Sequence, residues 1–280
     1  MRGKMGSIIE IKNLTKHYGK YRGVEDISFQ VQEGDIFAFL GPNGAGKSTT
    51  IRAMLGMIGF EQGEITIMGK DAVREKQTIL KEIGYMPSEA MFYPAMRVKD
   101  VIRFAADMRR LDCSREAERL CEELQVDKDK RIRELSLGNR KKVSIVCALQ
   151  HKPKLLILDE PTSGLDPLMQ EAFFRLLQEA NREGTTCFLS SHVLSEVKKY
   201  CHNAAIIKNG RVLKVDTVEK LSHTKLRLVK TWKNGKEESF THTGAMSELL
   251  QKLTCMAPED VLIEEPSLEE LFMQYYEEEK

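Results

Sequence analysis

The chain has 280 residues, 41% of them hydrophobic and 30% charged, with a formal net charge of +1. This length suffices for one large domain, or for one domain with a smaller appendage. The balanced charge argues against a generally basic surface that binds nucleic acid, and the apolar runs are too short to span a bilayer. We expect no secretory signal, and scattered cysteines without a C-x-x-C pair favour a reduced cytosolic setting.

The N-terminal part of the chain alternates apolar and polar residues, which is typical of strands. Residues 8–14 and 25–40 are predicted as strands separated by glycine turns. A helix is predicted from Lys47, and a short strand ending in a turn over residues 63–69. This part of the chain is therefore predicted to be mainly β-structure around one early helix.

Helical spacing dominates the middle of the chain. Residues 98–111 and 114–124 carry apolar residues at steps of three and four, which indicates amphipathic helices. The apolar run of residues 155–158 is typical of a parallel strand covered on both faces. A helix over residues 167–184 and another buried strand over residues 185–192 follow. This alternation predicts an α/β fold with a mostly parallel sheet.

The composition changes near Thr217, which indicates a domain boundary. We expect one domain over residues 1–216, with a helical insertion at about residues 88–135, and a small α+β domain over residues 217–280. In the second domain, the dipeptide Asn-Gly at residues 234–235 predicts a β-hairpin.

Two helices are predicted to complete the second domain. They cover residues 245–253 and 266–280. Ser267 and Glu270 form a capping box at the start of the latter.

Residues 41–49, GPNGAGKST, match the motif G-x-x-x-x-G-K-[ST] between a predicted strand and a predicted helix. In this phosphate loop, glycines let backbone N–H groups converge on phosphate oxygens, and the helix N-terminus adds positive potential. Lys47 is expected to reach the β- and γ-phosphates, and Ser48 to ligate Mg²⁺. The predicted nucleotide-binding residues are Gly41, Pro42, Asn43, Gly44, Ala45, Gly46, Lys47, Ser48 and Thr49.

Two acidic residues follow the buried strand at residues 155–158. Asp159 is expected to hold Mg²⁺ through water, and Glu160 to polarise an attacking water as the general base. Alone, such a pair is a solvated strand end about as often as not. A phosphate loop in the same chain favours the catalytic interpretation, with Lys47 as a further catalytic residue.

Three further segments occur in a specific order: LSLGN at residues 135–139, LLILDEPTSGLD at residues 155–166 and LSSH at residues 189–192. Together with the phosphate loop, they resemble the ATPase subunit of an ABC transporter over about Ile8–Leu213. The resemblance implies a P-loop ATPase core with an antiparallel β subdomain. It also implies ATP and Mg²⁺ as cofactors.

The same resemblance assigns roles to three residues. Tyr18 is expected to stack on adenine, and Asp166 to lie in the loop that joins two ATP sites. His192 is expected near the γ-phosphate as a further catalytic residue, whereas the alternative is a hydrogen-bonded histidine at a strand end.

Members of this family dimerise head to tail, so that the signature segment, residues 135–139, closes over ATP held by the partner's phosphate loop. By this resemblance, Ser136 and Gly138 are phosphate ligands at a helix start, where backbone amides and the helix dipole favour an anion. Lys141 and Lys142 are expected either to add positive charge nearby or to be solvated.

The chain departs from the family pattern at two places. Leu137 and Asn139 replace a glycine and the glutamine of the usual L-S-G-G-Q, but activity is expected because the serine and the second glycine are retained. Ser88 stands where the family usually has a glutamine near Mg²⁺. Glu89 is long enough to act as the metal ligand instead, and the alternative is a solvated loop residue.

The end of the chain, residues 263–280, resembles ATPases of the drug, bacitracin or sodium export type, which work with separate membrane subunits. We therefore expect the ATP-hydrolysing subunit of an exporter, cytoplasmic and peripheral on the inner face of the cell membrane. Its expected partners are a second ATPase subunit, identical or homologous, and integral membrane permease subunits. Met91, Phe92 and Tyr93 form either the surface that receives a membrane subunit or an ordinary loop.

Two other classes of protein compete with this interpretation. A soluble ABC ATPase that acts on a protein or ribosomal assembly is the alternative, although this chain has one phosphate loop and a net charge near zero. A small-molecule kinase with the same phosphate loop is disfavoured by the signature segment.

Overall fold

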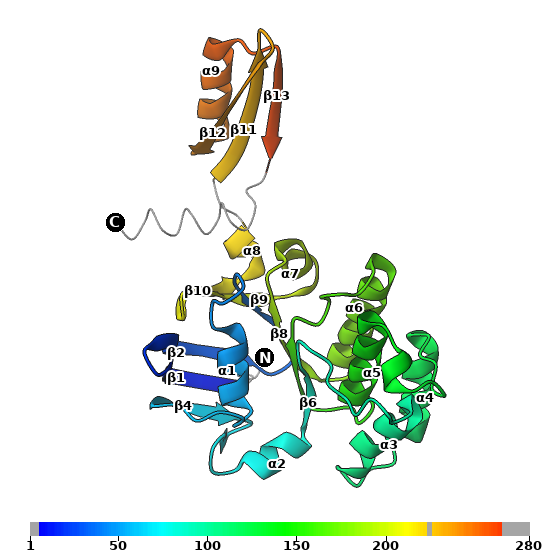
Figure 1. The fold of residues 1–280 in the computed structure, drawn as a ribbon. Coiled ribbons are helices and arrows are strands. Elements are labelled where there is room, and N and C mark those ends of the chain that lie inside the picture. Colours follow the sequence, from blue (N-terminus) through cyan, green and yellow to red (C-terminus); the bar gives the residue numbers. More distant parts are fainter. Residues whose placement is uncertain (1–5, 223–225, 265–280) are drawn as a thin grey trace, which may run out of the picture.

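The computed structural model describes residues 6–222 and 226–264. A four-stranded antiparallel sheet lies at the N-terminal side (Figure 1), in the order β2-β1-β4-β5. Its strands are β1 (Ser7–Tyr18), β2 (Tyr21–Gln32), β4 (Gln62–Ile67) and β5 (Lys70–Asp71). The first two strands extend beyond the predicted ranges and form one long hairpin.

The central sheet has six strands in the order β10-β9-β3-β8-β7-β6. The strands β3, β6, β7, β8 and β9 run parallel, and β10 pairs antiparallel with β9. Their bounds are β3 (Ile36–Leu40), β6 (Ile83–Met86), β7 (Leu155–Asp159), β8 (Thr186–Ser191), β9 (Asn203–Lys208) and β10 (Arg211–Thr217). The predicted mostly parallel α/β sheet is therefore confirmed.

An aromatic layer joins the two sheets. Phe29 of β2 stacks against Phe37 of β3 at 5.7 Å between ring centroids, and against Phe188 of β8 at 6.0 Å. The helix α1 (Lys47–Met54) lies beside the antiparallel sheet and follows β3 directly (Figure 1). A short helix, α2 (Lys76–Lys81), leads into β6.

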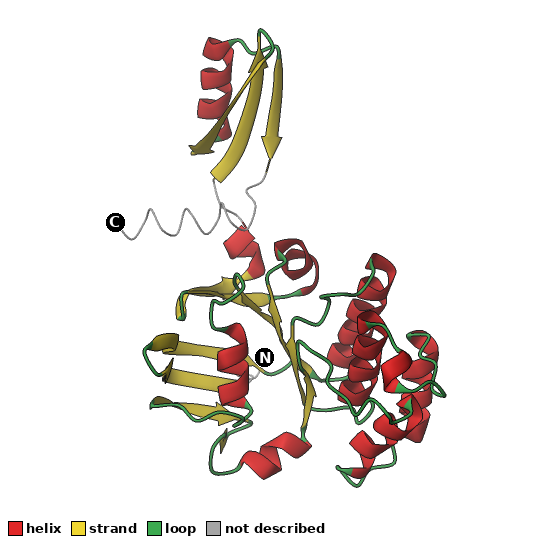
Figure 2. Cartoon of the chain, viewed as in Figure 1, coloured by secondary structure: helices red, strands yellow, loops and turns green. Residues whose placement is uncertain are grey.

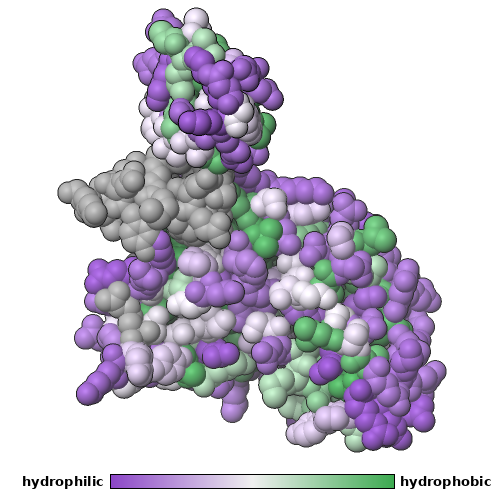
Figure 3. Space-filling model, turned by 45° about the horizontal axis from the view of Figure 1, so that its top comes forward, coloured by the Kyte–Doolittle hydropathy of each residue, from purple (hydrophilic) through white to green (hydrophobic). Residues whose placement is uncertain are grey.

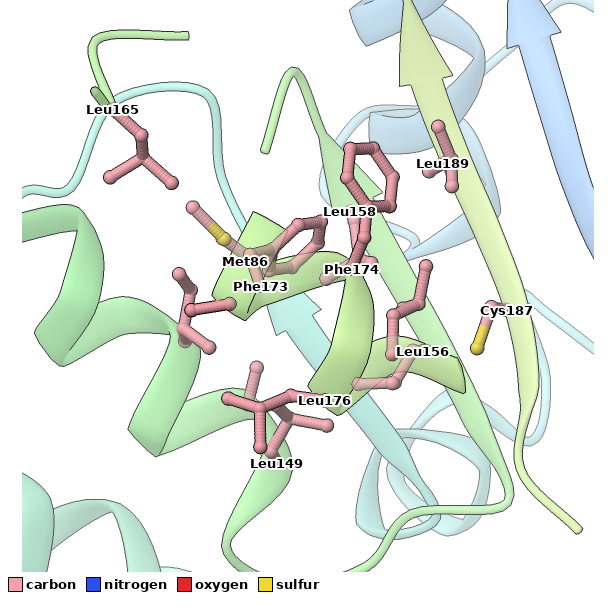
Figure 4. Close-up of a cluster of buried hydrophobic side chains, with 14 of the residues drawn as sticks. Met86, Leu149, Leu156, Leu158, Leu165, Phe173, Phe174, Leu176, Cys187 and Leu189 are labelled. Carbon is pink, nitrogen blue, oxygen red and sulfur yellow. The ribbon is translucent and has the colours of Figure 1, made fainter. Parts of the chain in front are cut away.

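Helices cover the face of the central sheet that points away from the antiparallel sheet (Figure 2). They are α3 (Val98–Asp107), α4 (Ser114–Glu123), α5 (Leu137–Leu149), α6 (Pro167–Arg182) and α7 (Leu194–Tyr200). Leucine and phenylalanine side chains of α5 and α6 pack on β7 and β8 around Phe173, Leu156 and Leu189 (Figure 4). The predicted insertion before residue 135 is helical, since α3 and α4 lie there.

Residues 226–264 form a third sheet and a helix with their own apolar core. Its order is β12-β11-β13, and Val229, Leu249 and Leu253 form the core between sheet and helix. The elements are β11 (Leu226–Lys233), β12 (Lys236–Thr243), α9 (Met246–Met256) and β13 (Asp260–Glu264). The preceding helix, α8 (Val218–Ser222), packs through Val218 and Leu221 on the core of the central sheet instead.

The predicted hairpin and the first of the two predicted helices in this region are confirmed. The hairpin turn has positive φ angles of 51° at Asn234 and 71° at Gly235, as a tight two-residue turn requires. The helix predicted for residues 266–280 lies outside the described residues, and the division of the chain at residue 217 stays a prediction. Within the described ranges, no helix combines the length and apolarity needed to cross a membrane.

Candidate functional site

The phosphate loop connects β3 to α1 and depends on glycine at several positions. Gly46 has a φ of 108°, and a Cβ atom there would lie 2.6 Å from Val24 Cγ1. A Cβ atom on Gly41 would lie 2.3 Å from the carbonyl oxygen of Ile207. Any side chain at these positions would therefore force the loop away from β2 and β9.

Backbone amides at the start of α1 are available to a ligand. The N–H of Thr50 donates to the Gly46 carbonyl at 3.0 Å. Among the described residues, the backbone N–H groups of Lys47, Ser48 and Thr49 donate to no partner. Unpaired amides at a helix N-terminus bind anions, and the helix dipole adds to this preference. The loop geometry therefore fits a bound phosphate group.

Lys47 connects the phosphate loop to the end of β7. Its Nζ donates to the carbonyl oxygens of Gly41 at 2.6 Å and Pro42 at 3.1 Å. The same nitrogen lies 3.0 Å from Glu160 Oε1, in an ion pair without hydrogen-bond geometry. The side chain is 5% exposed, so its charge is directed into the loop rather than into solvent.

Asp159 and Glu160 lie where β7 ends beside β8. Ser190 Oγ donates to Asp159 Oδ1 at 2.6 Å and accepts from the Glu160 N–H at 2.9 Å. On the other side, the N–H of Gly41 donates to the Ser191 carbonyl at 3.1 Å. The carboxyl ends of the parallel strands thus bring the two acids to the phosphate loop, as expected for a ligand site in such a sheet.

Glu160 also contacts His192. The ring Nδ1 lies 2.7 Å from Glu160 Oε2, and the imidazole is more exposed than the carboxylate. The structure therefore brings together Lys47, Glu160 and His192, the three predicted catalytic residues. A carboxylate oriented by a histidine and a lysine beside a phosphate site can take a proton from water.

The predicted metal ligands come from three elements at the same end of the sheet. Asp159 is buried, Ser48 is half-buried in the first turn of α1, and Glu89 is exposed just after β6. Since Met86 of β6 pairs with Leu158 of β7, residue 89 follows the strand next to Asp159. The described residues contain no cluster of three or more acidic, histidine or cysteine ligands. Such sparse oxygen donors fit Mg²⁺, which keeps several waters and binds substrate phosphates.

Tyr18 lies at the end of β1, close to the phosphate loop. Its ring carbon Cε2 would lie 3.0 Å from a Cβ atom on Gly23, and a Cβ atom on Gly46 would lie 3.1 Å from the Gly23 carbonyl oxygen. The ring is 44% exposed. An exposed aromatic face near the loop can receive a nucleobase.

The signature segment starts α5, away from the phosphate loop of the same chain. Ser136 caps this helix by accepting from the Asn139 N–H at 3.3 Å. The helix α5 packs against α3, α4 and β6, whereas α1 packs against β2 and β7. Ser136 is exposed, so it is accessible to a group outside the chain.

Gly138 of α5 contacts the loop before α6, and Asp166 lies at the end of that loop. A Cβ atom on Gly138 would lie 2.9 Å from the Gly164 carbonyl oxygen, so glycine is needed for this close approach. Asp166 caps α6, since its Oδ1 accepts from the Met169 N–H at 3.0 Å. The loop therefore touches the signature segment at Gly164, two residues before Asp166.

The solvated alternative for Lys141 is wrong. This side chain is 1% exposed, and its Nζ donates to the Glu160 carbonyl at 2.5 Å, so it is neither solvated nor directed at the helix start. The sequence held a signal for this burial: residue 141 precedes Ile145 and Leu149 at steps of four, which places it on the buried face of α5. Lys142, one position on, is half-buried.

The chain is similar to a known protein family and to several described proteins. A family model described as "ABC transporter" matches residues 24–163. The bacitracin transport ATP-binding protein BcrA of Bacillus licheniformis is 37% identical over 212 residues, which cover 75% of this chain and 69% of that protein. The linearmycin resistance ATP-binding protein LnrL of Bacillus subtilis is 35% identical over 216 residues, which cover 75% and 69%.

Solved structures agree with the sequence relatives. A structure described as the ATP-binding subunit of an ABC transporter superposes with a TM-score of 0.72 at 32% identity, covering 77% of this chain and 92% of that chain. A dimeric bacterial ABC transporter cassette has the same fold, with a TM-score of 0.66 at 22% identity, covering 75% and 98%. The phosphate loop, the acidic strand end and these relatives lead to one conclusion: the chain belongs to the ABC transporter family, as an ATP-binding and ATP-hydrolysing subunit.

Proposed function

We propose that this chain powers an exporter whose membrane-spanning part is a separate polypeptide. The observation that supports hydrolysis most strongly is the meeting of Lys47, Glu160 and His192 beside the phosphate loop. The exporter assignment rests on relatives described as bacitracin transport and linearmycin resistance proteins. A soluble ABC ATPase gains no support from these relatives, since both are described by transport or resistance.

Each side chain at the ATP site has a proposed role. Glu160 takes the proton from the water that attacks the γ-phosphorus, and His192 holds the carboxylate toward that water. Lys47 and the amides of α1 bind the β- and γ-phosphates. Asp159 and Ser48 would hold Mg²⁺, which when bound neutralises phosphate charge. Bond cleavage then releases ADP and phosphate.

The signature segment is proposed to complete the ATP site of a second copy or a homologous subunit. Ser136 and Gly138 lie at the N-terminus of α5, an end that favours an anion. Since Gly138 packs on Gly164, the loop with Asp166 would follow the signature segment when two chains close on ATP. Closure and release would then drive the membrane subunits.

The membrane partner is proposed to dock on the helical side of the ATPase. Met91 is 85% exposed and Tyr93 74% exposed, whereas Phe92 packs on the core. Figure 3 shows hydrophobic residues among the hydrophilic surface of this side. Two large exposed apolar side chains on a loop after β6 offer an anchor for a cytoplasmic segment of the permease. This docking would place the chain on the inner face of the membrane, with residues 217–280 as an accessory domain.

Affinity purification of the tagged chain from native membranes tests the transporter proposal. We expect a multi-span membrane protein to co-purify, and Met91→Glu with Tyr93→Glu to lose it while ATPase activity of the isolated chain persists. Val73→Glu, at another exposed apolar residue, serves as the control and should retain the partner. Co-purification of ribosomes or a soluble assembly in place of a membrane protein would favour the alternative class.

His192→Ala is expected to lower ATP turnover about ten- to a hundredfold. The substitution removes the 2.7 Å contact to Glu160 Oε2, so the carboxylate loses the group that orients it. Steady-state phosphate release measures the effect. His202→Ala, which changes the histidine just before β9, is the control. Wild-type turnover by His192→Ala would return this residue to a structural role.

Glu89→Ala is expected to raise the Mg²⁺ concentration required for half-maximal ATPase activity several-fold, because an oxygen ligand is lost. Ser88→Ala should change this concentration little, since a serine at this position is too short to replace the glutamine. Titration of activity with Mg²⁺ at saturating ATP makes the comparison. An unchanged Mg²⁺ dependence of Glu89→Ala would leave Glu89 as a solvated loop residue.

A further inference from the structure

Lys141 makes a buried contact outside the chemistry described so far. It lies on α5, just after the signature segment, and its Nζ donates to the carbonyl oxygen of Glu160 at 2.5 Å. Burial lowers the pKa of Lys141, and the carboxylates of Glu160, Asp159 and Glu196 act in the opposite direction. A buried ammonium group is unfavourable unless it is paired and hydrogen-bonded. This lysine is therefore held in place by the acidic end of β7.

The backbone of Glu160 has an unusual conformation. Its φ is +49°, in the left-handed region that residues with side chains rarely adopt and that surrounding contacts must maintain. Two side chains and one backbone group supply those contacts. Ser190 Oγ accepts from the Glu160 N–H at 2.9 Å, and the Glu160 carbonyl accepts from Lys141 Nζ and, at 3.3 Å, from the Ser163 N–H. The direction of the Glu160 carboxylate toward His192 depends on this fixed backbone.

The start of α5 also touches the loop that follows Glu160. Gly138 approaches the Gly164 carbonyl oxygen so closely that a Cβ atom would lie 2.9 Å from it. Leu137 Cδ2 would lie 3.4 Å from a Cβ atom on Gly164. Helix α5 therefore contacts the segment from Glu160 to Gly164 near both ends of that segment. Lys141 makes the polar contact.

We propose that Lys141 is a positioning residue for ATP hydrolysis, which fixes the main chain of Glu160 from the signature helix. The inference rests on the proposed role of Glu160 as general base and of residues 135–139 as a site for the partner's ATP. Under those roles, Lys141 links α5, which contacts the ATP held by the partner, to Glu160, which acts on the ATP held by its own chain. A shift of α5 on closure would thus reach Glu160 through a single hydrogen bond.

Lys141→Met tests this role, because it keeps a long unbranched side chain and removes the donor. We expect kcat to fall roughly ten- to a hundredfold, as for a misplaced catalytic group, with the KM for ATP changed less than about threefold. Lys141→Arg, which keeps a charged donor, should recover part of the rate. Lys142→Met removes the same charge one residue further and should keep kcat within about twofold.

A second comparison separates positioning from a general structural role. In a Glu160→Gln background, Lys141→Met should cause no further loss in the single-turnover rate, because the base it positions is absent. The double variant should also dimerise with ATP as Glu160→Gln does. If Lys141→Met does not fold, Lys141→Gln, which is too short to reach the carbonyl, replaces it in both comparisons.

The outcomes separate a failure of the positioning role from a failure of the proposed role of Glu160. Wild-type kcat in Lys141→Met, or an equal fractional loss with and without Glu160→Gln, would overturn the positioning role. Loss of ATP-dependent dimerisation in the double variant would do the same, since it indicates damage beyond Glu160. Near-normal hydrolysis by Glu160→Gln alone would instead remove the proposed base, whatever Lys141 does.

Discussion

Glu160→Gln is expected to bind ATP about as well as the wild-type chain and to hydrolyse it about a hundred- to ten-thousandfold more slowly. The amide has nearly the shape of the carboxylate but cannot accept the proton from the attacking water. The phosphate-binding amides of α1 and Lys47 stay in place, so the substitution removes chemistry and leaves binding. Nucleotide binding by equilibrium titration and turnover by phosphate release measure the two effects separately.

Glu196→Gln provides a matched control for that experiment. Glu196 is a second acid near the site, where its Oε2 accepts from Thr162 Oγ1 at 3.0 Å, and burial raises the pKa of this carboxyl group. Its neutralisation should change turnover only a few-fold, since it does not contact His192 or Lys47 in the way that Glu160 does. If Glu160→Gln retained near-normal turnover, Glu160 would lose the role of base.

Lys47→Ala is expected to weaken ATP binding roughly a hundredfold and to abolish turnover with it. The ammonium group makes charge-assisted hydrogen bonds to phosphate, each worth about 1.5–3 kcal/mol. The substitution also removes the donor to the Gly41 carbonyl and one of two donors to the Pro42 carbonyl, which keeps the Ala45 N–H. This loss loosens the loop. Fluorescence titration with an ATP analogue gives the affinity.

A lysine elsewhere controls for loss of a backbone contact. Lys76 Nζ donates to the Gly56 carbonyl at 2.6 Å, so Lys76→Ala removes a similar bond outside the ATP site. Lys76→Ala should leave the affinity for ATP unchanged. The melting temperatures of Lys76→Ala and Lys47→Ala should be close to each other. Unaltered ATP affinity in Lys47→Ala would contradict the assignment of the phosphate loop.

Much of the ATP site could be predicted from sequence because its signals are local. The glycines and lysine of residues 41–49 specify a loop geometry by themselves, and Asp159 and Glu160 follow an apolar strand directly. Parallel strands then bring these segments to the same edge of the sheet. The approach of His192 to Glu160 follows from the pairing of β7 with β8.

Features that depend on tertiary packing could not be predicted from the sequence. Nothing next to Lys141 in sequence shows that a strand end of opposite charge lies against it, and the left-handed backbone of Glu160 has no signature glycine or asparagine. The hairpin of β9 and β10 does carry a sequence signal, the dipeptide Asn209-Gly210. The two residues have positive φ angles of 47° and 75°, as a tight turn requires. Strand β13 pairs with β11 across the intervening helix α9, a long-range contact that periodicity does not reveal.

The most direct measurement concerns the proposal that each ATP site is built from two chains. Sedimentation in a Glu160→Gln background compares three samples with ATP: Ser136→Arg alone, Lys47→Ala alone and their mixture. The first lacks a usable signature segment and the second a usable phosphate loop, so neither should dimerise alone. Their mixture should form dimers that hold one ATP, because one interface then combines both intact parts. Dimerisation of Ser136→Arg alone with the ATP dependence of its parent would contradict a site built from two chains.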